Sequence, residues 1–137
     1  MLRARSALLA VACVSLCAAA ASAPAAPAAP RTVLVNFCGG ATSRPSTFVV
    51  ACGDGNYQLR GLHWRTWGAR IATATGWAHI NDCVPYCAAG RFHSYPVRLR
   101  ASRRADCSNG RAYRRLQIIF TQTRPAGIWT RLRLKCP

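Results

Sequence analysis

The sequence contains no glutamate, three aspartates and a single lysine among its 137 residues. The aspartates, Asp54, Asp82 and Asp106, are far apart in the chain, each in a segment with the composition of a turn or loop. Glycoside hydrolysis ordinarily needs two carboxyl groups facing one bond. A paired-carboxylate glycosidase is therefore nearly excluded, and no nucleophile elbow of the Gly-x-Ser-x-Gly kind is present either.

Positive charge is abundant in the same chain. Nineteen lysines and arginines against three acidic residues give a formal net charge of +16. An imbalance of this size concerns partners and solubility rather than the fold. It favours an anionic partner.

The first residues predict export. Arg3 and Arg5 precede an apolar run, residues 7–21, which is too short for a membrane span and ends in small residues. We expect a secretory signal peptide over 1–21, an Ala/Pro-rich linker over 22–31 and a single domain over 32–137. The sequences before Cys13 and Cys17 are poor lipid-attachment motifs. The predicted location is secreted, extracellular.

Removing residues 1–21 leaves six of the eight cysteines. An even number of cysteines in a short exported chain predicts three disulfides. The sequence allows many connectivities, and the most local set is the one we expect: Cys38–Cys52, Cys83–Cys87 and Cys107–Cys136.

Apolar and polar residues alternate along 97–101, 115–120 and 128–135, which predicts strands with one face on a core and the other in solvent. Shorter strands are expected at 33–35, 47–52 and 57–64. Residues 54–56 and 81–90 have the composition of turns and loops. Helical periodicity and internal repeats are absent from the sequence after residue 31. The expected fold is all-β, a small disulfide-stapled sandwich or partly closed barrel of six to eight strands.

Residues 50–96 concentrate the tryptophans, histidines and cysteines. The run CGDGN…GLHWRTWG…NDCVPYCAAGRFHSYPV within it resembles a family of small secreted actinobacterial proteins of uncharacterised function. The resemblance extends from Cys52 to Val97. It implies a secreted single domain, and it carries no activity, substrate or catalytic residue with it.

The basic residues of the last three predicted strands suggest a binding surface. If these strands form a meander, one sheet face carries Arg98, Arg100, Arg115, Arg131, Arg133, Lys135 and Trp129. Like charges opposite each other across strands are destabilising, so a bound anion would relieve them, and Trp129 could stack on a base or sugar.

We therefore expect a monomeric, non-enzymatic binding protein without cofactor or metal. Its partner would be a cell-wall polymer, a nucleic acid, an acidic protein or an anionic membrane surface. A solvated face that keeps the protein soluble is the simpler alternative.

The alternative function is a small secreted hydrolase of the ribonuclease kind. His63 and His93 would act as general base and acid, with arginines stabilising the developing charge. This hypothesis requires the fold to bring the two histidines together. A Ser-His-Asp set drawn from Ser94, a histidine and Asp82 requires the same.

Three further patterns have competing interpretations. On a straight strand Trp64 would face the core and Trp67 the arginines, where it could stack on a ligand, although we favour two core tryptophans. The spacing of His79, Cys83, Cys87 and His93 suits zinc, but export and the even cysteine count argue against a metal. The Cys83–Cys87 loop could present an inhibitor segment to a protease, and a membrane-disrupting toxin is a weaker possibility.

Overall fold

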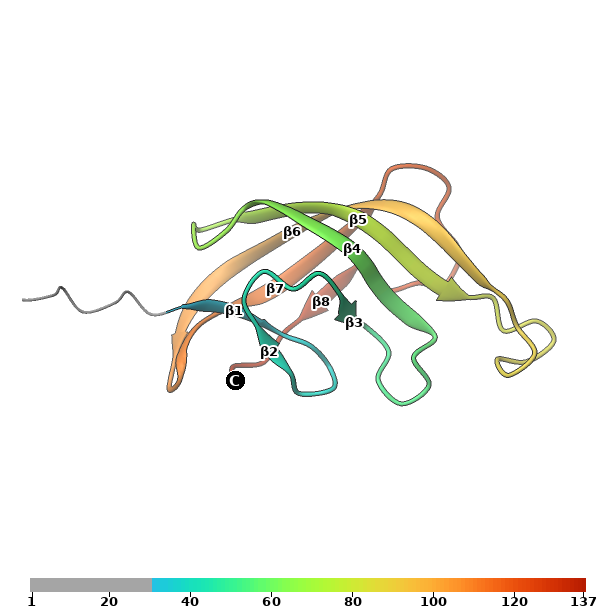
Figure 1. Cartoon of the computed structure of the whole chain (residues 1–137), viewed down its shortest axis with the longest axis horizontal. Coiled ribbons are helices and arrows are strands. Elements are labelled where there is room, and N and C mark those ends of the chain that lie inside the picture. The colour runs from blue at the N-terminus through green and yellow to red at the C-terminus, as the bar shows by residue number, and fades with distance from the viewer. Residues whose placement is uncertain (1–30) are drawn as a thin grey trace, which may run out of the picture.

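The computed structural model describes residues 31–137, so the predicted signal peptide and residues 22–30 of the predicted linker lie outside the described residues. The described chain consists of strands and loops, and it contains no helix that could cross a membrane. Eight strands are formed (Figure 1): β1 (Thr32–Val35), β2 (Ala41–Thr42), β3 (Phe48–Val49), β4 (Tyr57–Thr66), β5 (Ala72–Asn81), β6 (Phe92–Cys107), β7 (Gly110–Phe120) and β8 (Arg131–Arg133). The all-β prediction of six to eight strands is confirmed.

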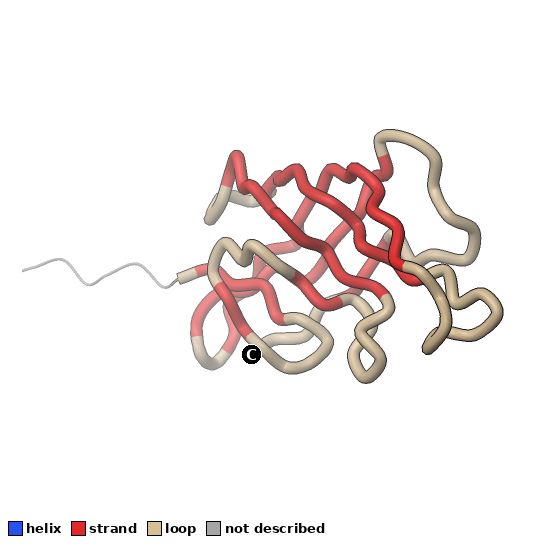
Figure 2. The backbone as a smooth tube through the Cα atoms, turned by 45° about the vertical axis from the view of Figure 1, so that its right-hand side comes forward, coloured by secondary structure: helices blue, strands red, loops and turns tan. Residues whose placement is uncertain are grey.

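The strands form one sheet in the order β2-β1-β7-β6-β5-β4-β3. The four long strands β4 to β7 are consecutive antiparallel neighbours. Two short strands share one edge of β7: β1 runs parallel to its first residues, and β8 runs antiparallel to it further along. The sheet curls into a half-barrel, with β4, β5 and β6 arching over the short strands (Figures 1 and 2).

The hydrophobic core lies inside this curl. Its largest fully buried side chains come from both long and short strands and their flanks: Tyr113, Phe48, Leu34, Leu59, Leu99, Leu116, Ile118 and Val50. Three inward positions of β5 carry the small residues Ala72, Ala74 and Ala78, and the larger Ile80 lies near the end of the strand. Small side chains there leave the concave side room for the larger ones brought in by β1, β3 and β8. The outward side of the arch is left to solvent.

Three disulfides staple the half-barrel. Cys38–Cys52 joins the β1–β2 loop to the turn after β3, and so links the two edges of the sheet. Cys83–Cys87 closes the β5–β6 loop, and Cys107–Cys136 ties the β6–β7 hairpin to the C-terminal segment. A bridge of this kind contributes about 2–4 kcal/mol. This matters in a domain whose core is limited by its size.

Both tryptophans of β4 and its flank pack inward. The Trp64 and Trp67 rings meet edge to face at 4.5 Å, and Trp67 also contacts the buried Tyr113. Their indole N–H groups donate to the carbonyls of Pro45 at 2.9 Å and Thr32 at 3.1 Å. The interpretation in which Trp67 is exposed beside Arg65 and His63 is wrong. Both tryptophans pack against the core, as the favoured interpretation predicted.

The reason lies in the backbone of β4. Gly61 has φ 58°, and the pairing with β5 shifts between Arg60 and His63 and again between Trp64 and Thr66. Each shift breaks the two-residue alternation of an ideal strand. The second shift lies between the two tryptophans, and it turns Trp67 toward the core instead of toward solvent.

Two expected strands are shorter in the structure. Only residues 48–49 of the predicted 47–52 and 131–133 of the predicted 128–135 form ladders. Neither β2 nor the long strand β5 was predicted. Long connections surround these strands, and their pairing depends on neighbours that are distant in sequence.

Candidate anion-binding surface

Five of the predicted basic residues share the convex outer face of the sheet. On β6 and β7, Arg98 is paired with Ile119 and Arg100 with Gln117. Gln117 is paired in turn with Arg131 of β8. Direct cross-strand partners point to the same side of a sheet, and Arg115 and Arg133 are also partners. The outer face therefore carries Arg98, Arg100, Arg115, Arg131 and Arg133.

Trp129 and Lys135 flank β8 rather than belong to it. Both are exposed, Trp129 to 63%. The carbonyl of Trp129 accepts a hydrogen bond at 3.2 Å from Tyr57, a buried residue of β4. Burial raises the pKa of Tyr57 far above its usual value, so it remains a donor. The pairing of β8 with β7 places Arg131 and Arg133 on the outer face. It does not extend to Trp129 or Lys135, so it does not assign these two residues to that face.

An open groove of about 690 Å³ runs over β5 on this face. Its floor includes the short side chains of Thr73 and Thr75, while longer basic side chains stand on the neighbouring strands β4 and β6. We call the following set the arginine groove: His63, Arg65, Thr73, Thr75, Arg98 and Arg100. The two threonines lie between His63 and Arg65 on one side and Arg98 and Arg100 on the other, and the difference in side-chain length explains the hollow.

A second open hollow of about 850 Å³ continues from the first, because Arg100 lines both. Four further arginines line it: Arg70, Arg103, Arg104 and Arg115. Of these only Arg115 was among the predicted residues. Arg70 lies in the β4–β5 turn, and Arg103 has a left-handed φ of 55°, so neither follows the alternation that reveals the other arginines. Together the two hollows form one cationic track.

The three aspartates lie outside this track. Asp54 caps its own turn by accepting a hydrogen bond from the Asn56 N–H at 3.0 Å, which lowers the pKa of Asp54. Within residues 31–137 the Asp106 carboxylate pairs with Arg111, and the Asp82 carboxylate contacts the His93 ring. The arginines of the two hollows therefore have no acidic partner in the described part of the chain.

The structure does not bring His63 and His93 together. His63 of β4 is paired with Thr75 of β5, and His93 of β6 is paired with Ile80 of β5. Five residues along a strand span about 17 Å, and an odd separation places the two on opposite faces. The ribonuclease hypothesis lacks the geometry that it requires.

A Ser-His-Asp arrangement is not formed either. Asp82 contacts His93 at 2.9 Å, whereas Ser94 contacts the Nδ1 of a different histidine, His79, at 3.1 Å. The carboxylate and the hydroxyl thus have different imidazole partners.

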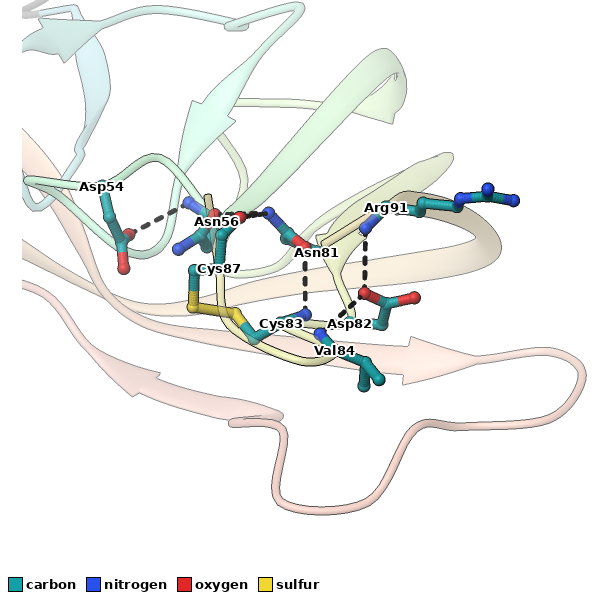
Figure 3. The surroundings of a disulfide bond; sticks show 8 residues. All are labelled: Asp54, Asn56, Asn81, Asp82, Cys83, Val84, Cys87 and Arg91. Carbon is teal, nitrogen blue, oxygen red and sulfur yellow. Dashed lines mark hydrogen bonds between the residues drawn. A yellow bond between two sulfur atoms is a disulfide. The ribbon is translucent and has the colours of Figure 1, made fainter. Parts of the chain in front are cut away.

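The Cys83–Cys87 loop is braced by Asn81 (Figure 3). The Asn81 side-chain oxygen accepts from the N–H of Cys83 at 3.0 Å, and its amide nitrogen donates to the Cys87 carbonyl at 2.8 Å and to Asn56 at 3.0 Å. Since the two cysteines are bonded to each other, neither offers zinc a thiolate. Among residues 31–137 no group of three or more His, Cys, Asp or Glu residues could hold a metal ion.

Asp82 braces the same loop. Its Oδ1 accepts from the N–H groups of Arg91 at 2.9 Å and Val84 at 3.1 Å, and its Oδ2 contacts His93. These contacts, led by the hydrogen bond from Arg91, lower the pKa of Asp82 to about 2. The carboxylate has a structural role in the loop.

No model of a known protein family, no curated protein and no solved structure matches this chain. The arginine-lined outer face is the most distinctive feature of the described surface.

Proposed function

We propose that this is a secreted, monomeric binding protein that holds an anionic polymer on the outer face of its half-barrel, along the arginine groove and the adjoining hollow. The three disulfides are consistent with an extracellular protein. The proposal rests on the surface and on the excess of basic residues, since 17 of the 19 lysines and arginines and all three aspartates lie after the predicted signal peptide.

One observation carries the proposal: the arginines stand in ladder register with like charges as neighbours. Arg115 and Arg133 face each other directly, and no carboxylate of the described residues lies between them. Like charges opposite each other across strands destabilise a sheet. A bound polyanion removes that cost, since each guanidinium forms bidentate contacts with phosphate or carboxylate oxygens.

The shape of the surface favours a polymer over a small anion. Arg98 and Arg100 lie two residues apart on β6, a spacing of about 7 Å. Each of them is exposed and therefore weakly attractive on its own in salt solution. A chain with repeated charges contacts many such groups at once and adds their contributions.

A polymer also fits better than an anionic membrane. The sheet is curled (Figure 1), and the arginine groove lies on its convex side with Thr73 and Thr75 in its lining. A flat bilayer would touch the rims of this surface and leave the floor unused.

The test uses long-chain inorganic polyphosphate, a polyanion without rings. Arg98→Gln/Arg100→Gln removes two charges from the groove, and Arg31→Gln/Arg124→Gln removes two exposed charges elsewhere. We expect the groove pair to weaken binding at least several-fold more than the control pair. Equal weakening by both pairs would show that only net charge matters, and that the face is merely solvated.

A further inference from the structure

Aromatic rings stand on the outer face immediately beyond the arginine groove. Trp77 is 51% exposed and Phe92 is 45% exposed. The Phe92 and His79 rings are parallel, with centroids 4.6 Å apart and an interplanar angle of 8°. We call Trp77, His79 and Phe92 the aromatic platform. A hydrogen bond between His79 and Ser94, at 3.1 Å, fixes the plane of the imidazole.

The platform continues the floor of the groove. Along β5, Trp77 follows Thr75 at the next outward position, and the two residues are paired with Pro96 and Arg98 of β6. Trp77 and Arg98 are therefore diagonal neighbours, a distance that long side chains can span. The surface changes from cationic to aromatic within one step of the strand.

The platform is held in place by the backbone beneath it. Gly61 lies at the bulge of β4, and a Cβ at that position would lie 3.7 Å from the Trp77 ring. The indole therefore lies close over the backbone of Gly61, at a distance where an added Cβ would be in ordinary van der Waals contact with it. On the same strand Arg60 is paired with Trp77, and Gln58 accepts two hydrogen bonds from the Arg60 guanidinium, at 3.0 and 3.1 Å.

We infer that the polymer is a single-stranded nucleic acid, with phosphates in the arginine groove and bases stacked on the aromatic platform. This inference rests on the proposed function and names its ligand. Surfaces that bind single strands without sequence preference combine a cationic track with exposed aromatic rings. An open antiparallel sheet with aromatic residues on its central strands is a known way to present both.

A duplex fits this face poorly. The major groove of DNA admits a helix or a two-stranded ribbon, whereas this face is four strands wide and follows a continuous arch. The basic residues on either side of the groove floor stand two strands apart, about 10 Å. A single strand can lie between them with its bases unpaired, and the bases of a duplex are stacked on each other and unavailable to Trp77.

A chain without rings leaves the platform unused. Polyphosphate or a wall polymer of alcohol phosphates would contact the arginines and gain nothing from Trp77 or Phe92. Truncation of a stacking side chain therefore distinguishes a nucleic acid from other polyanions. Each stacked base lost corresponds to a decrease in affinity of about 5- to 140-fold.

The experiment measures binding of the intact protein to oligodeoxythymidylate, to a DNA duplex of the same length and to polyphosphate. Trp77→Ala and Phe92→Ala are compared with Phe37→Ala, which truncates an exposed ring in the β1–β2 loop. We expect single-strand affinity to fall by about 5-fold or more for the platform variants. Polyphosphate affinity should stay unchanged for all three, and the native protein should prefer the single strand to the duplex.

Each outcome has a consequence. The inference is overturned if the platform variants bind the single strand with the same affinity as the native protein and Phe37→Ala. It is also overturned if the native protein prefers the duplex. Retained polyphosphate binding that depends on Arg98 and Arg100 would then leave the proposed function standing. Loss of polyphosphate binding by Trp77→Ala would indicate a damaged sheet. In that case Trp77→Phe, which keeps a ring, must restore binding of both polyphosphate and the single strand for the inference to hold.

Discussion

Arg115 of β7 and Arg133 of β8 are direct cross-strand partners, and both side chains project from the outer face of the sheet. Within residues 31–137 the carboxylates are engaged elsewhere, with His93 and Arg111 or within the Asp54 turn. The face thus contains an unneutralised repulsion in the free protein.

This repulsion predicts a salt-dependent gain of stability. Arg133→Gln should raise the free energy of unfolding by about 0.2–1 kcal/mol at low salt, because it removes one of two facing like charges. The gain should largely disappear at high salt, where the charges are screened. Urea unfolding at two ionic strengths measures it, with Arg124→Gln as the control. A gain that salt does not change would mean that the pair is not under electrostatic strain.

The β5–β6 loop should loosen in acid. The pKa of Asp82 is about 2 in the folded protein, below its ordinary value of 3.8. Because the pKa is lowered in the folded protein, the ionised carboxylate stabilises the folded state at any pH above the ordinary pKa. This contribution is lost as the pH falls through about 4 toward 2. Hydrogen exchange at the Val84 and Arg91 amides, which donate to Asp82, should accelerate in this interval relative to the core.

Asp82→Asn provides the control for that experiment. The variant keeps an oxygen that can accept from the same amides and lacks the charge. Its loop should exchange faster at neutral pH, and the acid-dependent step should be missing. A step of the native size in the variant would assign the effect to another group.

Gly61 should be required both for the bulge in β4 and for the position of Trp77. Gly61→Val places a β-branched side chain at φ 58° and against the indole. Strain at a left-handed position costs about 1–2 kcal/mol, and crowding adds to it. Gly68→Val is the matched control, since Gly68 has φ 77° and no neighbour within 4 Å of an added Cβ. Gly61→Val should reduce stability more than the control and change Trp77 fluorescence.

The arrangement of the C-terminal strands could be predicted because their signals are local. Leu99, Leu116 and Leu132 mark the inward register of β6, β7 and β8, and short connections or one loop join these strands in sequence order. The five shared arginines follow from that register. The disulfide partners are separated by 4 to 29 residues and are also the most local set.

The other features of the fold and of the candidate site depend on interactions that the alternation of apolar and polar residues does not reveal. Trp67 points inward because the pairing of β4 shifts a second time between Trp64 and Thr66, where the sequence has no glycine or proline to mark a bulge. The parallel pairing of β1 with β7 joins residues far apart in sequence. The aromatic platform was missed because Trp77, His79 and Phe92 lie on two strands whose register was not assigned from the sequence.

The central claim is that the arginine groove binds a polyanion, and the salt dependence of polyphosphate binding tests it most directly. For a single-stranded nucleic acid the logarithm of the binding constant falls with the logarithm of salt concentration by about 0.7 for each phosphate contact, and we take the same coefficient for polyphosphate. If Arg98 and Arg100 each contact one charge, Arg98→Gln/Arg100→Gln should make this slope shallower by about 1.4, while Arg31→Gln/Arg124→Gln leaves it nearly unchanged. Equal slopes for the native protein and the groove variant would contradict the account.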